Sequence, residues 1–192
     1  TLLIGRGRGN ALRVVALVVY VVGIVFAMAM SGVFHLLDPE SAGRSVLRRL
    51  DHAGIFFLIA ATYTPIHVIQ FRGAMRWGVL GFVWACAIMG IVFKAVFFDR
   101  IPEWIGLTLY LGLGWVGILS VIALLRRYGW PPLWPLVWGA LAYTIGATLE
   151  FLRWPIVIPG VIGPHELFHL FVLGGVTWHF VYIWRLLPAE GR

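Results

Sequence analysis

Long apolar stretches alternate with short polar segments along the whole chain. A transmembrane α-helix needs about 20 mostly apolar residues to cross roughly 30 Å of hydrocarbon. The segments between the apolar stretches carry the Pro, Gly, Asp and Arg residues that are typical of loops. The pattern therefore predicts six membrane-spanning helices, at residues 11–37, 50–71, 76–98, 102–125, 132–152 and 163–187.

Backbone chemistry favours helices over strands for these spans. Each span must satisfy its own backbone N–H and C=O groups in lipid, which a helix does. The alternating strands of about ten residues that mark a transmembrane barrel are not seen. We expect an all-α integral membrane protein, with one bundle domain over residues 1–192. Residues 1–5 resemble the tail of another span and the chain begins without Met, so we expect that a first helix is missing.

The composition supports lipid as the solvent. Hydrophobic residues make up 61% of the chain and charged residues only 12%, whereas soluble domains carry about 25% charged residues. The net charge of +7 does not indicate nucleic-acid binding, because the basic residues lie mostly in loops, where they set topology. Cys86 is the single cysteine, which excludes a cysteine-based metal site. We expect a multi-pass protein of the cell membrane.

The alternating direction of successive spans assigns polar residues to membrane faces. If the first span ends on one face, the second and the sixth both start on it. That face receives Ser31 and His35 from the first span, Asp51 from the second and residues 165–169 from the sixth. Ionisable groups within spans are costly and mark functional sites by default. We therefore expect one site near this face.

The start of the sixth span has the spacing of a metal site. His165 and His169 lie at i and i+4, so both imidazoles project from one side of a helix. Two His with an intervening Glu also match the zinc-protease pattern. His35 would supply a third nitrogen, and three protein ligands plus a water are the usual plan of a catalytic zinc site. The alternative is that the pair packs helices and bonds to carbonyls, with His35 at the interface.

Three further polar residues are candidates for the chemistry. Asp51 could accept a hydrogen bond from the zinc-bound water, and Ser31 could polarise a substrate oxygen. The alternative for Asp51 is the N-cap of the second span. Glu166 could be a reserve general base, a partner that orients a histidine, or an acid at the helix start.

The remaining ionisable residues have simpler interpretations. We expect His52 at the membrane interface. We expect His67 and His179 to bond between helices or to reach the far face. Lys94 and Glu150 lie near span ends, where long side chains can snorkel.

Several ordered motifs resemble the progestin and adiponectin receptor-like family, which includes bacterial haemolysin-III-type proteins. Ser31-Gly32-Val33-Phe34-His35 resembles its Ser-x-x-x-His motif, and Leu50-Asp51-His52 resembles its Leu-Asp-His motif. Residues 139–144 resemble its penultimate span and residues 165–174 its last. The resemblance covers nearly the whole chain but departs at the start, where the family's first helix and its acidic motif are missing.

The resemblance implies a seven-helix fold with zinc on His35, His165 and His169. It also implies a zinc-bound water near Asp51, with Ser31 beside it. Members of the family are linked to ceramidase-like hydrolysis of lipid amides, to receptor signalling and, in bacteria, to haemolysis.

Several functions compete for this pattern. The leading hypothesis is a zinc-dependent hydrolase of a lipid amide or ester, ceramidase-like, with the zinc-bound water as nucleophile and a membrane lipid as substrate. The alternative is a membrane receptor or lipid sensor with a structural zinc ion. An intramembrane zinc protease carries its two-His motif early, not in the last span. A haemolysin-type pore former needs a polar stripe that the spans lack. Substrate identity and oligomeric state stay open.

Orientation also stays open. The face opposite the expected site carries nine basic residues: Arg6, Arg8, Arg13, Arg72, Arg76, Arg126, Arg127, Arg185 and Arg192. The site face carries six: Arg44, Arg48, Arg49, Lys94, Arg100 and Arg153. The positive-inside rule then places the site outside, whereas the adiponectin-receptor branch, by resemblance, has it on the cytoplasmic side.

Overall fold

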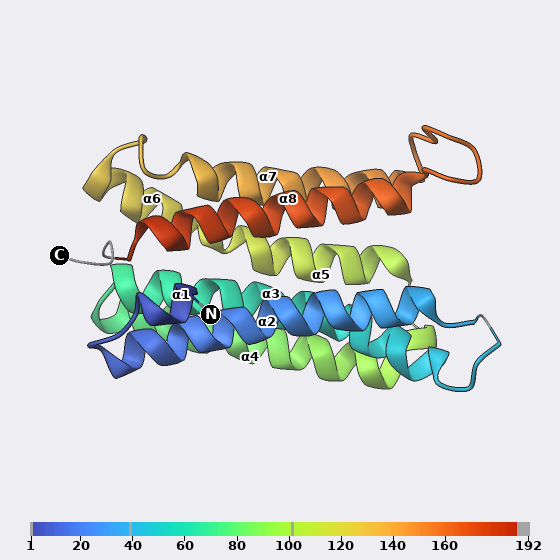
Figure 1. Cartoon of the computed structure of the whole chain (residues 1–192), viewed down its shortest axis with the longest axis horizontal. Coiled ribbons are helices and arrows are strands. Elements are labelled where there is room, and N and C mark those ends of the chain that lie inside the picture. Colours follow the sequence, from blue (N-terminus) through green and yellow to red (C-terminus); the bar gives the residue numbers. More distant parts are fainter. Residues whose placement is uncertain (1, 39, 101, 188–192) are drawn as a thin grey trace. The chain divides into compact units, whose positions relative to one another are not determined.

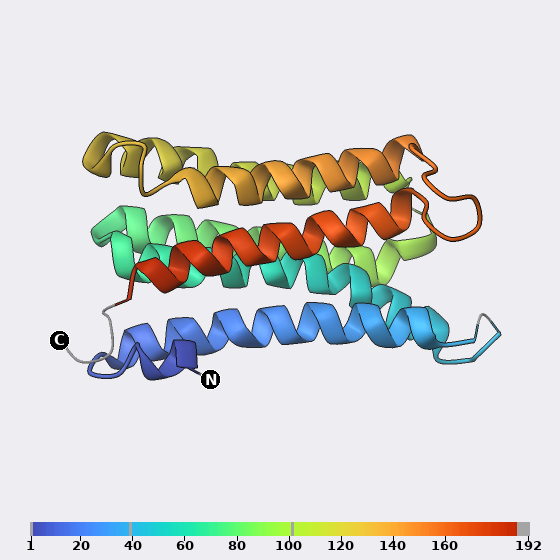
Figure 2. The ribbon, with the colours of Figure 1, turned by 45° about the horizontal axis from the view of Figure 1, so that its top comes forward.

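The structure is a computed structural model that describes residues 2–38, 40–100 and 102–187. Over these residues the chain is helical, apart from turns, loops and one isolated β-bridge between Ile158 and Ile162 (Figure 1, Figure 2). Six segments of it are long and apolar enough to cross a membrane, as the sequence predicts. The chain divides into two compact units, Thr1–Pro102 with Leu187–Arg192, and Glu103–Leu186.

The first unit is organised around a central helix. It contains α1 (Leu2–Gly5), α2 (Ala11–Leu36), α3 (Arg44–Gln70), α4 (Gly73–Phe97) and the 3₁₀ turn η1 (Phe98–Arg100). Both α2 and α4 pack on α3.

Small residues allow these helices to approach closely. Gly23 of α2 lies against Ala61 of α3, and Gly90 of α4 lies against the ring of Phe56. A Cβ at either glycine would clash with its neighbour. Small residues at contacts let helices pack tightly in lipid, where no hydrophobic effect drives helices together.

The second unit contains α5 (Glu103–Trp115), α6 (Gly117–Tyr128), α7 (Trp134–Leu152) and α8 (Pro164–Arg185). The main packing is between α7 and α8.

Two rings and two glycines interlock the last two helices. The Tyr143 ring of α7 lies over Gly175 of α8, where an added Cβ would meet it at 2.6 Å. The His179 ring of α8 lies over Gly139 of α7, where a Cβ would meet Nε2 at 2.8 Å. The two rings stack with centroids 5.5 Å apart. This interlock fixes the register of α8 on α7.

One predicted boundary was wrong by six residues. The second span was expected from residue 50, but α3 begins at Arg44. Arginines had ended the apolar stretch, yet the helix continues through them because they bond to neighbouring helices. Arg44 donates to the carbonyl oxygens of Phe34 and Leu37 at the end of α2, and Arg49 donates to that of Ala95 at 2.9 Å.

The fourth predicted span, residues 102–125, consists of two helices. The helix is interrupted at Val116, between α5 and α6. Gly112, Gly114 and Gly117 surround the interruption, and glycine costs about 1 kcal/mol in a helix relative to alanine. Residues Trp104–Tyr128 together are still long and apolar enough for one membrane crossing.

Candidate metal site

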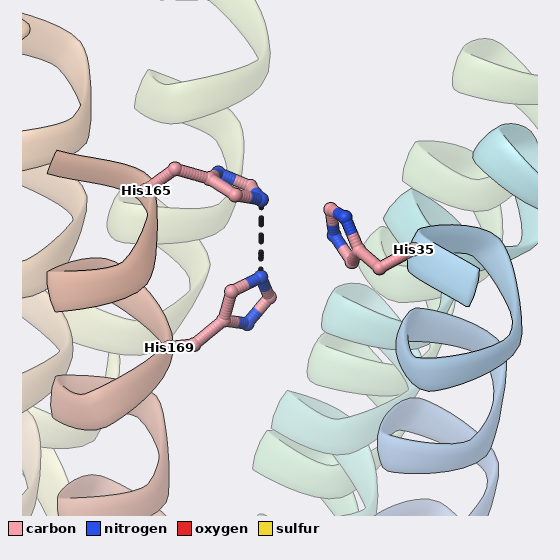
Figure 3. Close-up of side chains that lie close together, drawn as sticks. All are labelled: His35, His165 and His169. Carbon is pink, nitrogen blue, oxygen red and sulfur yellow. Dashed lines mark hydrogen bonds between the residues drawn. The ribbon is translucent and has the colours of Figure 1, made fainter. Parts of the chain in front are cut away.

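The first turn of α8 sets the direction of its two histidines. Gly163 is the N-cap and Pro164 the first helical residue. The Gly163 N–H donates to Oε2 of Glu166 at 2.8 Å, which is the acid half of a capping box. With the helix fixed from its first residue, His165 and His169 project from the same side of α8, one turn apart (Figure 3).

The two imidazoles meet through the nitrogens that a metal would need. The Nε2 atoms of His165 and His169 lie 3.1 Å apart, and both side chains are half-buried. Two nitrogens that share a tetrahedral ion at 2.0–2.1 Å are about 3.3 Å from each other. The pair is therefore already spaced as two ligands of one ion.

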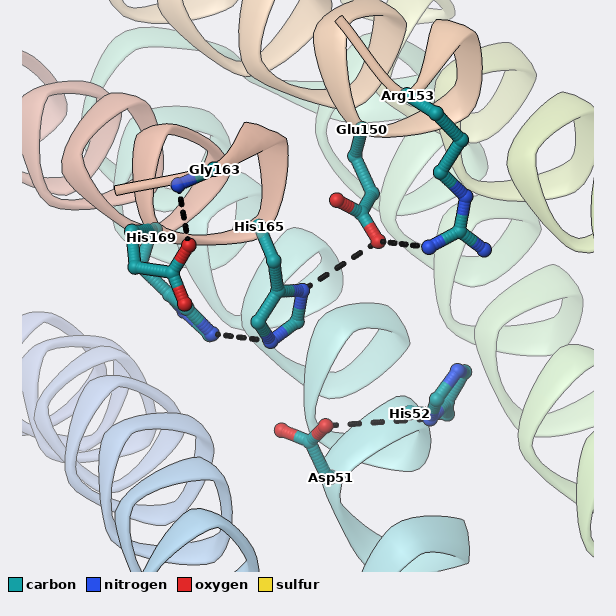
Figure 4. Close-up of polar contacts among 8 residues, drawn as sticks. Asp51, His52, Glu150, Arg153, Gly163, His165 and His169 are labelled. Carbon is teal, nitrogen blue, oxygen red and sulfur yellow. Dashed lines mark hydrogen bonds and ion pairs between the residues drawn. The ribbon is translucent and has the colours of Figure 1, made fainter. Parts of the chain in front are cut away.

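Glu150 lies behind the pair, on the last turn of α7. Its Oε1 is 3.4 Å from Nδ1 of His165 and 3.4 Å from Nη1 of Arg153 (Figure 4). Its Oε2 is buried without a hydrogen-bond partner in the described part of the chain. A carboxylate at Nδ1 holds the proton on that nitrogen and leaves the Nε2 lone pair for a metal.

Glu150 is the site residue that the sequence analysis missed. It was interpreted as a snorkelling side chain at a span end. The signal was nevertheless present, because the alternation of spans assigns the end of the fifth and the start of the sixth to one face. Within the second unit, the contact between Glu150 and His165 agrees with that assignment.

The third histidine predicted for the site, His35, belongs to the first unit, and its part in a metal site stays a prediction. His35 lies in the last turn of α2, exposed, with its ring against that of Phe34 at a centroid distance of 4.8 Å. Imidazole suits zinc, copper, iron and nickel. The spacing of the His165 and His169 nitrogens thus suits a transition metal and does not by itself select zinc.

Asp51 and Ser31 lie toward the same end of the first unit as His35. Asp51 is half-buried, with Oδ2 3.9 Å from Nδ1 of His52 (Figure 4). It cannot be the N-cap of α3, because that helix begins two turns earlier, after Gly43. Ser31 precedes His35 by one turn of α2. The catalytic roles expected for both residues stay predictions.

Comparison with known proteins identifies the family. The family model described as haemolysin-III related matches residues 2–180. This chain belongs to the haemolysin-III-related family. Hemolysin-3 of Bacillus cereus is 33% identical over 183 residues, covering 95% of this chain and 80% of the relative. The Hemolysin-3 homolog of Bacillus subtilis is 30% identical over 167 residues, covering 87% and 75%.

An animal relative extends the comparison. Human monocyte to macrophage differentiation factor is 27% identical over 176 residues, covering 88% of this chain and 69% of the relative. No solved structure gives a significant match. The six apolar helices and these relatives make the haemolysin-III-related chain a multi-pass integral membrane protein.

Three other ionisable residues of this haemolysin-III-related chain have contacts within its helical units. His67 is fully buried and its Nδ1 lies 2.9 Å from the carbonyl oxygen of Met75, so it bonds between α3 and α4 as expected. His179 forms the interlock of α7 and α8. Lys94 does not snorkel but is 5% exposed, with Nζ 5.2 Å from the ring centroid of Phe98.

Two further residues of the site face have structural contacts. His52 Nδ1 lies 2.9 Å from the carbonyl oxygen of Arg48, and its ring meets Phe98 edge-on. Glu166 is exposed and caps the helix start, which is one of its three expected roles. Its role as a reserve base stays a prediction.

Proposed function

We propose that this protein is a zinc-dependent membrane hydrolase that cleaves a lipid amide or ester, as a ceramidase does. The observation that carries the proposal is the His165–His169 pair, spaced for one ion and backed by the Glu150 carboxylate. A pair of histidines that only packed helices would not need a carboxylate on the outer nitrogen. Carboxylate–histidine–metal arrangements are the usual means of orienting a ligand.

His35 would complete the site as the third zinc ligand. The alternation of spans supports it, since the end of α2 and the start of α8 belong to one membrane face. Three protein ligands leave one coordination position for water or substrate, which is the plan of catalytic rather than structural zinc sites. Zn²⁺, when bound, polarises a carbonyl and lowers the pKa of water.

Residues of the chain would supply the remaining catalytic and positioning groups. Asp51 would take the proton of the attacking water, whose oxygen bonds to the carbonyl carbon of the lipid. Ser31 would donate a hydrogen bond to the carbonyl oxygen. Glu150 would keep His165 in the ligating tautomer, and Glu166 is the reserve base. The C–N or C–O bond breaks and the amine or alcohol leaves with a proton.

A lipid substrate suits the position of the site. The pair lies at the start of a membrane-spanning helix, so an amphiphile could reach it sideways from the bilayer with its headgroup still in water. We expect this bilayer to be the cell membrane.

The test is a substrate screen on purified protein with measured zinc content. We expect zinc-loaded protein to hydrolyse one class among ceramides, other N-acyl lipids and lipid esters. Removing the zinc should abolish the activity, and adding zinc back should restore it. Bound zinc without hydrolysis of any of these lipids would contradict the proposal and favour a receptor or lipid sensor with a structural ion.

A red-cell lysis assay belongs beside the screen, because two relatives carry haemolysin names. Lysis that survives zinc removal would favour a pore former over the hydrolase.

A further inference from the structure

A groove opens on the first unit, at the opposite end of α2 from His35. Its walls come from α2 and α4 and its floor from the last third of α3, because α3 separates the two outer helices there. The volume is about 330 Å³, at the lower end of the roughly 300–1,000 Å³ of small-molecule sites. A volume of this size suits one hydrocarbon chain better than a whole lipid.

The lining of the groove offers no spare hydrogen bond. Its polar side chains satisfy each other, since Trp84 Nε1 donates to Oγ1 of Thr64 at 3.1 Å. The Thr64 hydroxyl in turn donates to the carbonyl oxygen of Ala60 at 2.8 Å. The other lining residues are apolar or glycine. An occupant with buried polar groups would leave them unpaired, so the lining selects hydrocarbon.

The groove runs inward from one end of the unit. It begins at Leu12, in the first turn of α2, and at Trp77, in the second turn of α4. It extends along α4 to Trp84, a rise of about 10 Å at 1.5 Å per residue. That depth is about a third of the roughly 30 Å hydrocarbon core. The groove therefore covers the part of an acyl chain nearest its headgroup.

The mouth of the groove lies at a basic end of the unit. This end carries five arginines: Arg6, Arg8, Arg13, Arg72 and Arg76. The acidic side chains described in the first unit, Asp38, Glu40 and Asp51, all lie toward the opposite end.

One of these arginines is held at the mouth itself. Arg76 Nε donates to the carbonyl oxygen of Phe71 at 2.7 Å, and its guanidinium carbon is 5.8 Å from the ring centroid of Trp77. A guanidinium used in this way still has N–H groups for a phosphate.

We propose that this groove binds an acidic phospholipid. One acyl chain lies in the groove between α2 and α4, and the phosphate lies among Arg13, Arg72 and Arg76. The apolar lining accounts for the acyl chain, and the arginines at this end, where the described residues of the unit include no acidic side chain, account for the charge of the headgroup. The site is independent of the hydrolase proposal, since it shares no residue with the histidine site.

Two glycines on α4 provide a matched pair of test variants. Gly81 lines the groove, and a Cβ added there meets no atom within 4 Å. Gly81→Leu should therefore fill the groove without disturbing the fold. Gly78 is three residues earlier, equally open and outside the groove. Gly78→Leu is therefore the control for added bulk on the same helix.

Native mass spectrometry of detergent-purified protein can count the lipids retained. The probes are phosphatidylglycerol and phosphatidylcholine with identical acyl chains. Wild type and Gly78→Leu should retain phosphatidylglycerol in preference. Each buried methylene contributes roughly a fourfold factor in affinity, so displacing two of them in Gly81→Leu should weaken binding about 15-fold. The double variant Arg13→Gln, Arg72→Gln should lose the preference for phosphatidylglycerol. It should still retain both lipids to a similar extent, because the groove itself is unchanged.

Three results would overturn the proposal. Equal lipid retention by Gly81→Leu and Gly78→Leu would mean that the groove does not hold the chain. Equal retention of both lipids by wild type would mean that the arginines do not select the headgroup. A wild-type dimer that becomes monomeric only in Gly81→Leu would mean that a second copy of the protein fills the groove.

Discussion

Glu150→Gln is the sharpest probe of the metal site, because Glu150 acts on the ion only through His165. The substitution keeps the shape of the side chain and removes its charge. Loss of such an outer partner typically costs 10–100-fold in metal affinity. The contact here is 3.4 Å long and is shared with Arg153, whereas good hydrogen bonds are about 2.7–3.2 Å. We therefore expect the lower end of the range, about tenfold.

This loss has a stability counterpart. Tenfold weaker binding of saturating zinc to the folded state removes about 1.4 kcal/mol of stabilisation. For a chain of this size, that lowers the melting temperature by roughly 3–6 °C. The assay is zinc titration against a competing chelator, combined with melting in detergent at fixed zinc.

The control is Arg153→Gln, which removes the exposed partner of Glu150 but leaves the contact with His165. Exposed ion pairs contribute little, so its zinc affinity should stay near that of wild type. If Glu150→Gln binds zinc as tightly as Arg153→Gln does, Glu150 does not orient a ligand and the reasoning fails.

Three further predictions follow from the same structure. Asp51→Asn should keep its zinc while the rate of hydrolysis falls about a hundredfold to ten-thousandfold, as for loss of a general base. Glu40→Gln is the control acid and should hydrolyse as wild type does. Unchanged turnover by Asp51→Asn would contradict its role as the base. Removing zinc from wild type should lower the melting temperature in detergent by several degrees, and an unchanged melt would show that the ion does not hold helices together. Gly175→Ala should destabilise by about 1–3 kcal/mol through overpacking against Tyr143, whereas its neighbour Gly174, with nothing within 4 Å, should accept alanine without loss in the same melting assay.

The spans were readable because lipid imposes a length and an apolar composition on each crossing. Charge was the wrong guide to the start of α3, since Arg44 is helical and bonds to carbonyls at the end of α2. The interruption at Val116 lies among glycines. Mean hydropathy over a window does not detect it, because the interruption does not change the number of apolar residues in the window.

The part of the site that could be predicted is the part whose geometry follows from residue spacing along one helix. The i, i+4 rule alone predicts the contact between His165 and His169. The role of Glu150 was not predicted because its partner, His165, lies on another helix. Only the register of α7 on α8 brings the two side chains together. That register depends on Tyr143 and His179 resting on glycines, which no single motif reveals. The capping role of Glu166 follows from the helix starting at Pro164, which the sequence placed within one residue.

Metal analysis of purified protein tests the central claim most directly. His165→Ala with His169→Ala removes both nitrogens of the pair, and His52→Asn is the control for loss of a histidine outside the predicted site. We predict about one zinc per chain in wild type and in His52→Asn, and loss of most of it in the double variant. Full zinc content in the double variant would contradict the account.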